Sequence, residues 1–312
     1  MRGCGAAFAP LVQQMAEHLV GAFSAAGPAA GVTGNAVDKT AQAAVPYLYA
    51  ASILVGEFGT FGASRRKMAA DPATAAGLDN VVSTLLTSLS NAVFAHLTSP
   101  ERFTAMPDTV EEFFFLAQRG VTFAPSPLLE SPLLASIFQC GLAGMHVEHR
   151  EARQGILAFF EEVVGAAVED GAKDETERQR KAARRPAVEA LLAPPQTGPT
   201  LVTLIVRALV GDLPSTAVDE GHGTLAGVLW KLNRFAREML RAWLATSLQT
   251  IDVGVVPDQE RSDFMVELFK DEPGCAPGSK ASQDRFFFVV VTFAGRARWQ
   301  RNKIMREKSG LV

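Results

Sequence analysis

The residues best suited to chemistry in this chain are two histidines. His146 and His149 are three residues apart, a spacing that can place two imidazoles on one helical face as zinc ligands. No third ligand is evident, and the general-base glutamate of an HExxH motif would need a different position. Histidines at a helix end or on the surface are the better interpretation. We therefore expect no metal site and no cofactor.

Two pairs of adjacent carboxylates, Glu111-Glu112 and Glu161-Glu162, have the residue type for general acid and base work. Nothing marks a shared pocket around either pair, and solvated helix faces are the simpler interpretation. The Gly-His-Gly segment at 221–223 is too short for a phosphate-binding loop, and neither a GxSxG nor a Walker sequence occurs. We expect no catalytic residues, and hence a protein that is not an enzyme.

The elements that carry these residues are predicted to be amphipathic helices. Apolar residues recur at i, i+3, i+4 and i+7 in stretch after stretch, for example in 82–97, 156–167 and 240–251. Such a stripe lies on one face of a helix and must be buried against another element. Helices are expected near 6–25, 46–58, 80–97, 107–124, 132–145, 148–169, 200–210, 224–233, 236–250 and 259–270.

Local signals suggest where some of these helices begin. Asp79 or Asn80 is expected to cap the third helix, and Thr109 with Glu112 has capping-box spacing at the start of the fourth. The helices follow one another in pairs roughly every 40–60 residues, close to the ~40–47 of HEAT-type repeats. The predicted fold is all-α, an α-solenoid of about five antiparallel helix pairs plus a terminal helix.

Composition and charge narrow the possible partners. The 312 residues are 48% hydrophobic and carry a net charge of −3, which gives no global basic field for nucleic acid. The most apolar runs, near 201–210 and 286–294, are well short of the ~20 residues that span a bilayer. Three scattered cysteines suggest neither disulfides nor zinc. We expect a soluble intracellular protein without direct nucleic-acid or membrane partners.

The chain is expected to form a single array over 1–312, with a charged loop at 170–185 and a Pro/Gly/Ser linker at 271–282. The last element, 284–295, contains the run FFFVVVTF and has strong β propensity. A lone strand would have no partner in a helical array, so we predict a helix there. The basic series from Arg296 to Lys308 is expected to be a solvated helix end, with contact to an acidic partner as the alternative.

Several segments resemble transportin-SR-like nuclear import receptors of the importin-β (karyopherin) superfamily. They are YLYAASILVGEFG at 47–59, PDTVEEFF at 107–114, HREA at 149–152, VLW at 228–230, WL at 243–244 and SL at 247–248. Each alone is weak, but they follow the order and separations of the family's C-terminal portion, in register from about residue 6 to residue 299. Their collinearity carries the resemblance.

The resemblance implies a right-handed superhelix of HEAT pairs that carries protein cargo, typically arginine/serine-rich, between cytoplasm and nucleus. Members of this family release their cargo when the GTPase Ran binds in the nucleus. In family members the amino-terminal half mainly engages Ran and the pore, and an arginine-rich helix binds phosphorylated cargo. We find no counterpart of either part in these residues. No Ran-binding residue is therefore carried over. A HEAT scaffold or adaptor unrelated to transport is the alternative.

Partner contacts are expected on the second, inner helix of each pair, since the concave face is the usual binding surface of such arrays. The candidate residues are Glu111, Glu112, Arg150, Arg153, Lys231 and Arg234. A second expectation concerns the first helix, where the apolar face around Phe8, Leu11 and Leu19 would be left without a neighbouring repeat. An uncovered face of this kind would make the chain self-associate or require a partner segment.

Overall fold

The computed structural model describes residues 5–26, 35–68, 72–170, 172–193, 197–214, 224–270 and 278–309. Every element assigned within these ranges is a helix, which confirms the predicted all-α class. The chain divides into two compact units, Met1–Val163 and Val164–Val312, and each unit is described by itself. A single array over the whole chain, with its superhelical handedness, stays a prediction.

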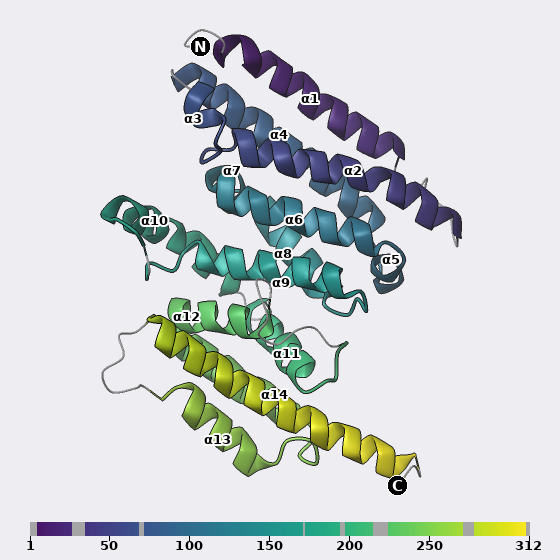
Figure 1. Ribbon diagram of the computed structural model, residues 1–312, viewed down its shortest axis with the longest axis vertical. Helices are drawn as coiled ribbons and strands as arrows, with labels where there is room; N and C mark the ends of the chain where they lie inside the picture. Colours follow the sequence, from purple (N-terminus) through teal and green to yellow (C-terminus); the bar gives the residue numbers. More distant parts are fainter. Residues whose placement is uncertain are drawn as a thin grey trace. The chain divides into compact units, whose positions relative to one another are not determined.

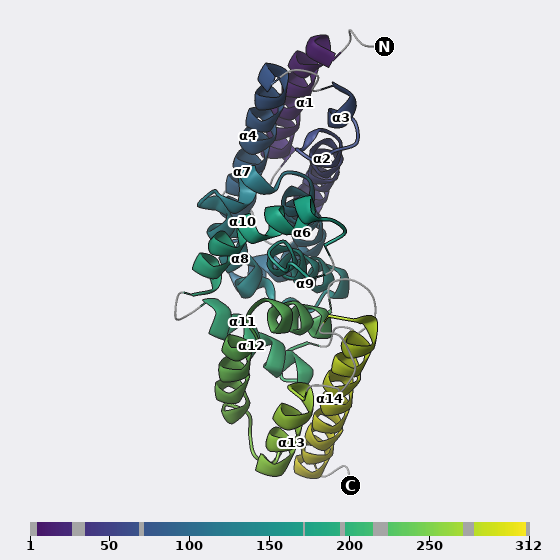
Figure 2. The same ribbon diagram turned by 90° about the vertical axis from the view of Figure 1, so that its left-hand side faces the viewer.

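The first unit consists of long helices joined by short ones. Its elements are α1 (Gly5–Ala26), α2 (Asn35–Phe58), α3 (Arg65–Met68), α4 (Pro72–His96), α5 (Pro100–Ala105), α6 (Pro107–Phe123), α7 (Pro125–Leu129), α8 (Leu133–Gly144) and α9 (Arg150–Gly165). α1 and α2 run antiparallel, and α4 with α6 and α8 with α9 repeat this arrangement (Figure 1). α4 and α8 lie in one layer, while α2, α6 and α9 lie in the other (Figure 2). The HEAT-type pairing is thus present in this unit.

The core of the first unit is centred on buried phenylalanines. They are Phe113 and Phe114 of α6, Phe138 of α8, and Phe159 and Phe160 of α9. The Phe138 and Phe160 ring centroids are 4.6 Å apart, and those of Phe114 and Phe159 are 5.6 Å apart. Tilted aromatic pairs at such distances add to the energy of burial. The aromatic run at 113–115 therefore acts mainly in packing.

The second unit contains the remaining helices. They are α10 (Glu175–Leu192), α11 (Thr197–Leu209), α12 (Leu225–Gln249), α13 (Asp258–Leu268) and α14 (Lys280–Lys308). α12 is bent at Ala236, whose backbone leaves the helical region at φ −155° and ψ 67°. The two helices predicted at 224–233 and 236–250 are the two arms of this bent helix, and the predicted break falls at the kink.

α14 confirms the helix predicted for 284–295 in spite of the β propensity of its aromatic and β-branched run. The Ser279 hydroxyl caps the helix by accepting a hydrogen bond from the backbone N–H of Ser282 at 3.3 Å. Its buried residues follow helical spacing, namely Phe286, Val290, Phe293, Ala294 and Ala297. Burial of this stripe outweighs an intrinsic preference of a few tenths of a kcal/mol per residue.

Several predicted boundaries were wrong. α2 begins at Asn35, well before the predicted start at Pro46, so that Pro46 lies inside the helix. The alanine-rich segment before it favours a helix, and the Pro46 side chain is exposed to solvent. The predicted capping box does not form, because α6 begins at Pro107 and its N-cap residue is Met106.

Asp79 lies inside α4 and does not cap it. Its carboxylate accepts two hydrogen bonds from the Arg65 guanidinium, at 2.7 and 2.8 Å, and one from the Thr60 hydroxyl at 3.0 Å. A bidentate pair of this geometry is among the stronger polar interactions in proteins. It fixes the segment before α4 to the helix, and it leaves Arg65 only 6% accessible.

The segment 170–185, expected to be a charged loop, is helical from Glu175 onward. The Asp174 carboxylate caps α10 by accepting the backbone N–H of Glu177 at 2.7 Å. Glu175 and Arg178 form an ion pair one turn apart at 2.7 Å. Ala, Glu, Lys and Arg all favour helices, and the charge run that suggested a loop is a helix surface. Residues 271–277 of the expected linker lie outside the described residues.

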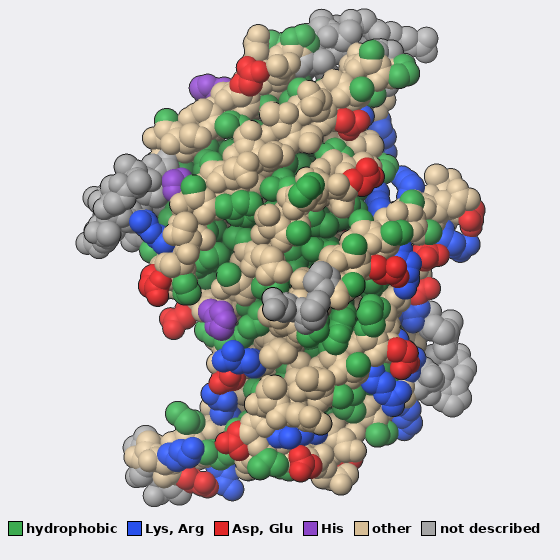
Figure 3. All heavy atoms as spheres, turned by 180° about the vertical axis from the view of Figure 1, so that it is seen from behind, with side chains coloured by type: hydrophobic (Ala, Val, Ile, Leu, Met, Phe, Trp, Pro, Cys, Tyr) green, Lys and Arg blue, Asp and Glu red, His purple; other side chains and the backbone are tan. Residues whose placement is uncertain are grey.

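The exposed apolar face expected on α1 is present in part. Leu11 is 46% exposed and Met15 is 52% exposed, whereas Leu19 is half-buried and the side chain of Phe8 lies outside the described residues. From behind, hydrophobic side chains are also exposed over much of the first unit (Figure 3). Apolar surface of this extent favours association.

We predict that the chain self-associates through α1 at micromolar concentration. Light scattering should then give an average mass above that of the monomer. The double change Leu11→Glu and Met15→Glu should restore the monomer mass, because two charges cannot be buried in an apolar contact without a large cost. Val253→Glu, at a residue of the second unit that is 56% exposed, is the control. A monodisperse wild-type monomer would contradict the prediction.

Candidate protein-binding surfaces

The acidic pair on α6 lies at the edge of the α6–α9 layer. Glu111 and Glu112 are both half-buried. Burial raises the pKa of Glu112, and the negative charges of Glu111 and Asp108 raise it further. Burial also raises the pKa of Glu111; His149 lowers that pKa, while Glu151 and Asp108 raise it. Carboxylates from α6 and α9 thus form a locally negative surface, which we call the acidic edge: Asp108, Glu111, Glu112 and Glu151.

Glu112 has an unusual environment within the acidic edge. Its Oε2 atom is buried and accepts no hydrogen bond from the described residues. A carboxylate kept away from water without a donor is destabilised, so the neutral acid is favoured. This explains the direction of the shift in the pKa of Glu112.

We expect Glu112→Gln to stabilise the fold at neutral pH. The folded-state pKa of Glu112 is raised, so the ionised form costs stability above that pKa, and the cost disappears as pH falls through it toward the unfolded value of about 4.3. Urea denaturation should give a higher midpoint for the variant at neutral pH, and the difference should vanish near pH 4. Glu130→Gln, at an exposed residue, is the control. A lower midpoint for Glu112→Gln at neutral pH would refute this assignment.

Arg150 and Arg153 both lie in the first turn of α9, but only one of them is accessible. Arg150 is exposed, whereas Arg153 is 3% exposed and its Nη1 donates to the Val147 carbonyl at 2.7 Å. Burial lowers the pKa of Arg153, and Glu148 partly offsets this. Arg153 therefore fixes the turn before α9, and Arg150 alone of the two is available to a partner.

Lys231 and Arg234 lie on α12 in the second unit, and both are half-buried. The Arg234 guanidinium forms an ion pair with Asp170 and lies over the Trp230 ring, 5.7 Å from its centroid. Burial lowers the pKa of Arg234, and so does the charge of Arg237. These contacts hold α12 against the turn that follows α9. Of the six predicted contact residues, four therefore belong to the first unit and two to the second.

The other residues tested for chemistry have structural surroundings. His149 Nδ1 accepts the backbone N–H of Ala152 at 3.4 Å and lies 3.6 Å from Glu151, so it caps α9. No group of three or more His, Cys, Asp or Glu side chains in the described ranges is arranged to hold a metal ion. Burial raises the pKa of Cys140 to about 12, which makes its thiol a poor nucleophile. The 221–223 segment lies outside the described residues.

The C-terminal basic series is partly structural as well. Arg298 donates from Nε to the Leu209 carbonyl and from Nη2 to the Ala208 carbonyl, both at 2.9 Å. It thereby satisfies carbonyls at the end of α11 and favourably meets the negative end of its dipole. Arg301 donates to Asp212 at 2.7 Å. Arg298 and Arg301 therefore do not belong to the solvated helix end that we expected. Only other residues of the basic series can form it.

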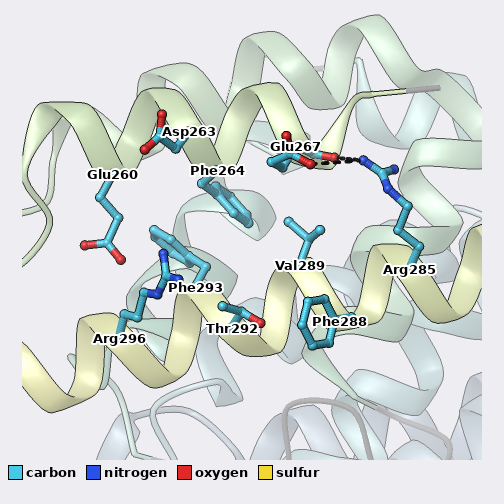
Figure 4. Close-up of a pocket in the computed structure, with 10 residues that line it drawn as sticks. All are labelled: Glu260, Asp263, Phe264, Glu267, Arg285, Phe288, Val289, Thr292, Phe293 and Arg296. Carbon is cyan, nitrogen blue, oxygen red and sulfur yellow. Dashed lines mark hydrogen bonds and ion pairs between the residues drawn. The ribbon is translucent and has the colours of Figure 1, made fainter. Parts of the chain in front are cut away.

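Sequence reasoning missed a groove between α13 and α14. Its volume is about 370 Å³, and the Phe264 and Phe293 rings stack across it with centroids 4.1 Å apart and planes 22° apart. Glu260 and Glu267 of α13 stand near its two ends, facing Arg296 and Arg285 of α14 (Figure 4). The aromatic and β-branched run of α14 could have indicated this groove. It contains more apolar residues than one buried stripe of a helix requires.

No protein-family model matches the chain. Within the described helices, none is both long and apolar enough to cross a membrane. The chain is similar to Transportin MOS14 of Arabidopsis thaliana, with 28% identity over 226 residues. The match covers 71% of this chain and 20% of the plant protein, so the chain spans about a fifth of the length of that relative. This similarity supports a likeness to transportins of the importin-β family.

Proposed function

We propose that this chain is the cargo-binding C-terminal portion of a transportin-SR-like import receptor, and that it binds protein partners without catalysing a reaction. The similarity to a transportin along 71% of the chain carries the proposal, and the helix pairs of the first unit support it. Such a receptor shuttles between cytoplasm and nucleus.

The acidic edge suggests the chemistry of the cargo. Glu111 and Glu112 have raised pKa values, due first to burial and then in part to neighbouring carboxylates. A guanidinium placed beside these groups would relieve the repulsion between their negative charges. Arginine fits best, because its planar donors can serve two carboxylate oxygens at once. Arginine/serine-rich proteins are therefore the proposed cargo.

A pull-down with the whole chain tests this function. An immobilised arginine/serine-rich peptide should retain the chain, and the same peptide with glutamine in place of arginine should not. The double change Glu111→Lys and Glu151→Lys should reduce retention at least about tenfold, since it reverses the field at the acidic edge. Glu130→Lys, at an exposed residue of the same unit, should leave retention unchanged.

Ran provides a further arm of this experiment. The family's main Ran-binding region has no counterpart that we identified in these residues, so Ran loaded with GTP should not release the peptide. Failure to retain the arginine/serine-rich peptide, or equal retention of the glutamine version, would contradict cargo binding. That outcome would favour the alternative, a HEAT scaffold unrelated to nuclear transport.

A further inference from the structure

We propose that the groove between α13 and α14 binds an amphipathic helical peptide of another protein, one with an apolar stripe bordered by lysine or arginine. This proposal goes beyond cargo binding at the acidic edge, because it rests on different residues in a different unit. It holds equally for a transport receptor and for a scaffold.

One aromatic side chain of the groove is largely exposed to solvent. Phe288 is 70% exposed, and it lies on α14 beside Val289, with the stacked pair Phe264 and Phe293 alongside (Figure 4). A large aromatic side chain in water is a favourable anchor for a partner, because its burial removes apolar surface from water. The neighbouring side chains provide a continuous apolar floor.

The rim of the groove indicates the charge of the partner. Glu260, Asp263 and Glu267 follow one another at i, i+3 and i+7 along α13 and all line the groove. The Oε1 atom of Glu260 is buried and accepts no hydrogen bond within the described ranges. A buried acceptor without a donor is costly. The negative charge of this rim therefore favours a partner that carries lysine or arginine, whereas an acidic partner would be repelled.

The basic residues of α14 do not cancel this charge along the whole rim. Arg285 lies at one end, where it donates to the backbone carbonyls of Glu267 and Lys270 and lies 3.7 Å from the Glu267 carboxylate. Its guanidinium therefore completes the C-terminal end of α13. Arg296 is at the opposite end. The Asp263 carboxylate lies between the two ends and accepts a hydrogen bond from the neutral Gln259 amide at 2.8 Å. This contact does not cancel its negative charge, which can attract a cationic partner.

The dimensions suit a short helix. The lining residues of α14 extend from Arg285 to Arg296, which is about 16 Å at 1.5 Å per residue. A partner helix of about three turns covers this length and places apolar residues at i, i+3, i+4 and i+7 over the floor. Carboxylates one turn apart on α13 then face basic residues that are one turn apart on the partner.

Fluorescence anisotropy with the full chain tests the proposal. The probe is a labelled amphipathic peptide with a leucine stripe flanked by lysines, and its counterpart carries glutamate in place of each lysine. The lysine peptide should bind with an affinity that falls as salt rises, and the glutamate peptide should bind at least about tenfold more weakly. An arginine/serine-rich peptide, which lacks the apolar stripe, should also bind this groove more weakly than the lysine peptide.

Two pairs of variants separate the groove from general effects. Asp263→Lys and Phe288→Ser should each weaken binding of the lysine peptide at least about tenfold. Glu238→Lys, on α12, and Val266→Ser, at a residue of α13 that is 59% exposed and outside the groove, should leave binding unchanged. Circular dichroism confirms that each variant is folded.

Three results would overturn the proposal. They are no binding of the lysine peptide, equal binding of the glutamate peptide, and unchanged binding to both Asp263→Lys and Phe288→Ser. If light scattering instead showed self-association that Phe288→Ser abolishes, the groove would belong to a second copy of this chain. If the acidic edge does not bind the arginine/serine-rich peptide, the measurements on the groove are unaffected. The proposal for the acidic edge and the proposal for the groove can therefore fail separately.

Discussion

Phe160→Ala should destabilise the first unit by about 3–5 kcal/mol, a typical cost of removing a large buried aromatic side chain. Phe160 is fully buried and packs against Phe138 with ring centroids 4.6 Å apart. The site has little room to collapse, because a methyl group on Gly141 would already lie 2.8 Å from the end of the Phe160 ring. The cavity would therefore persist, and the lost contacts would not be recovered.

The measurement for Phe160→Ala is urea denaturation followed by far-UV circular dichroism. The control is Phe288→Ala, at a phenylalanine that is 70% exposed, and its free energy of unfolding should change by no more than about 0.5 kcal/mol. Similar losses for the two variants would show that Phe160 is not packed as described.

Arg153→Ala and Arg150→Ala should differ sharply although the two residues are one turn apart. Arg153→Ala removes a buried charged donor and leaves the Val147 carbonyl without its 2.7 Å partner, so the fold should lose about 2–3 kcal/mol. Arg150→Ala changes an exposed residue and should alter stability by less than about 0.5 kcal/mol. Thermal unfolding of both variants measures the difference.

Arg153→Lys adds a third arm to this comparison. Lysine keeps the charge but not the planar guanidinium, so it should recover only part of the loss. An Arg153→Ala protein as stable as the wild type would restore Arg153 as a candidate for partner contact. Substantial destabilisation by Arg150→Ala would show that the turn before α9 is held differently.

Helical periodicity predicted the elements well because burial imposes it. The stripe of α14 overrode its β propensity, and the bend of α12 fell where two predicted helices met. The ends of the helices were harder to predict, because one type of side chain can either cap a helix or form an ion pair. Asp79 has the residue type of a cap, but it serves as the acceptor for Arg65, which only the folded chain brings near it.

The candidate contact residues show the same limit. Spacing alone cannot distinguish Arg150 from Arg153, since the difference between them is the Val147 carbonyl at the end of the preceding turn. The groove between α13 and α14 arises from the packing of two helices separated by the expected linker. Neither helix alone shows which of its faces remains open, so the outward position of Phe288 could not be predicted.

We propose that this chain recognises arginine-rich protein segments through its acidic edge. The most direct test is an anisotropy titration of a labelled arginine/serine-rich peptide with the full chain at low and at high salt. We predict saturable binding at low salt that weakens as salt screens the charges and is largely lost in the Glu111→Lys, Glu151→Lys variant. No saturable binding at low salt, or binding that the variant leaves unchanged, would contradict it.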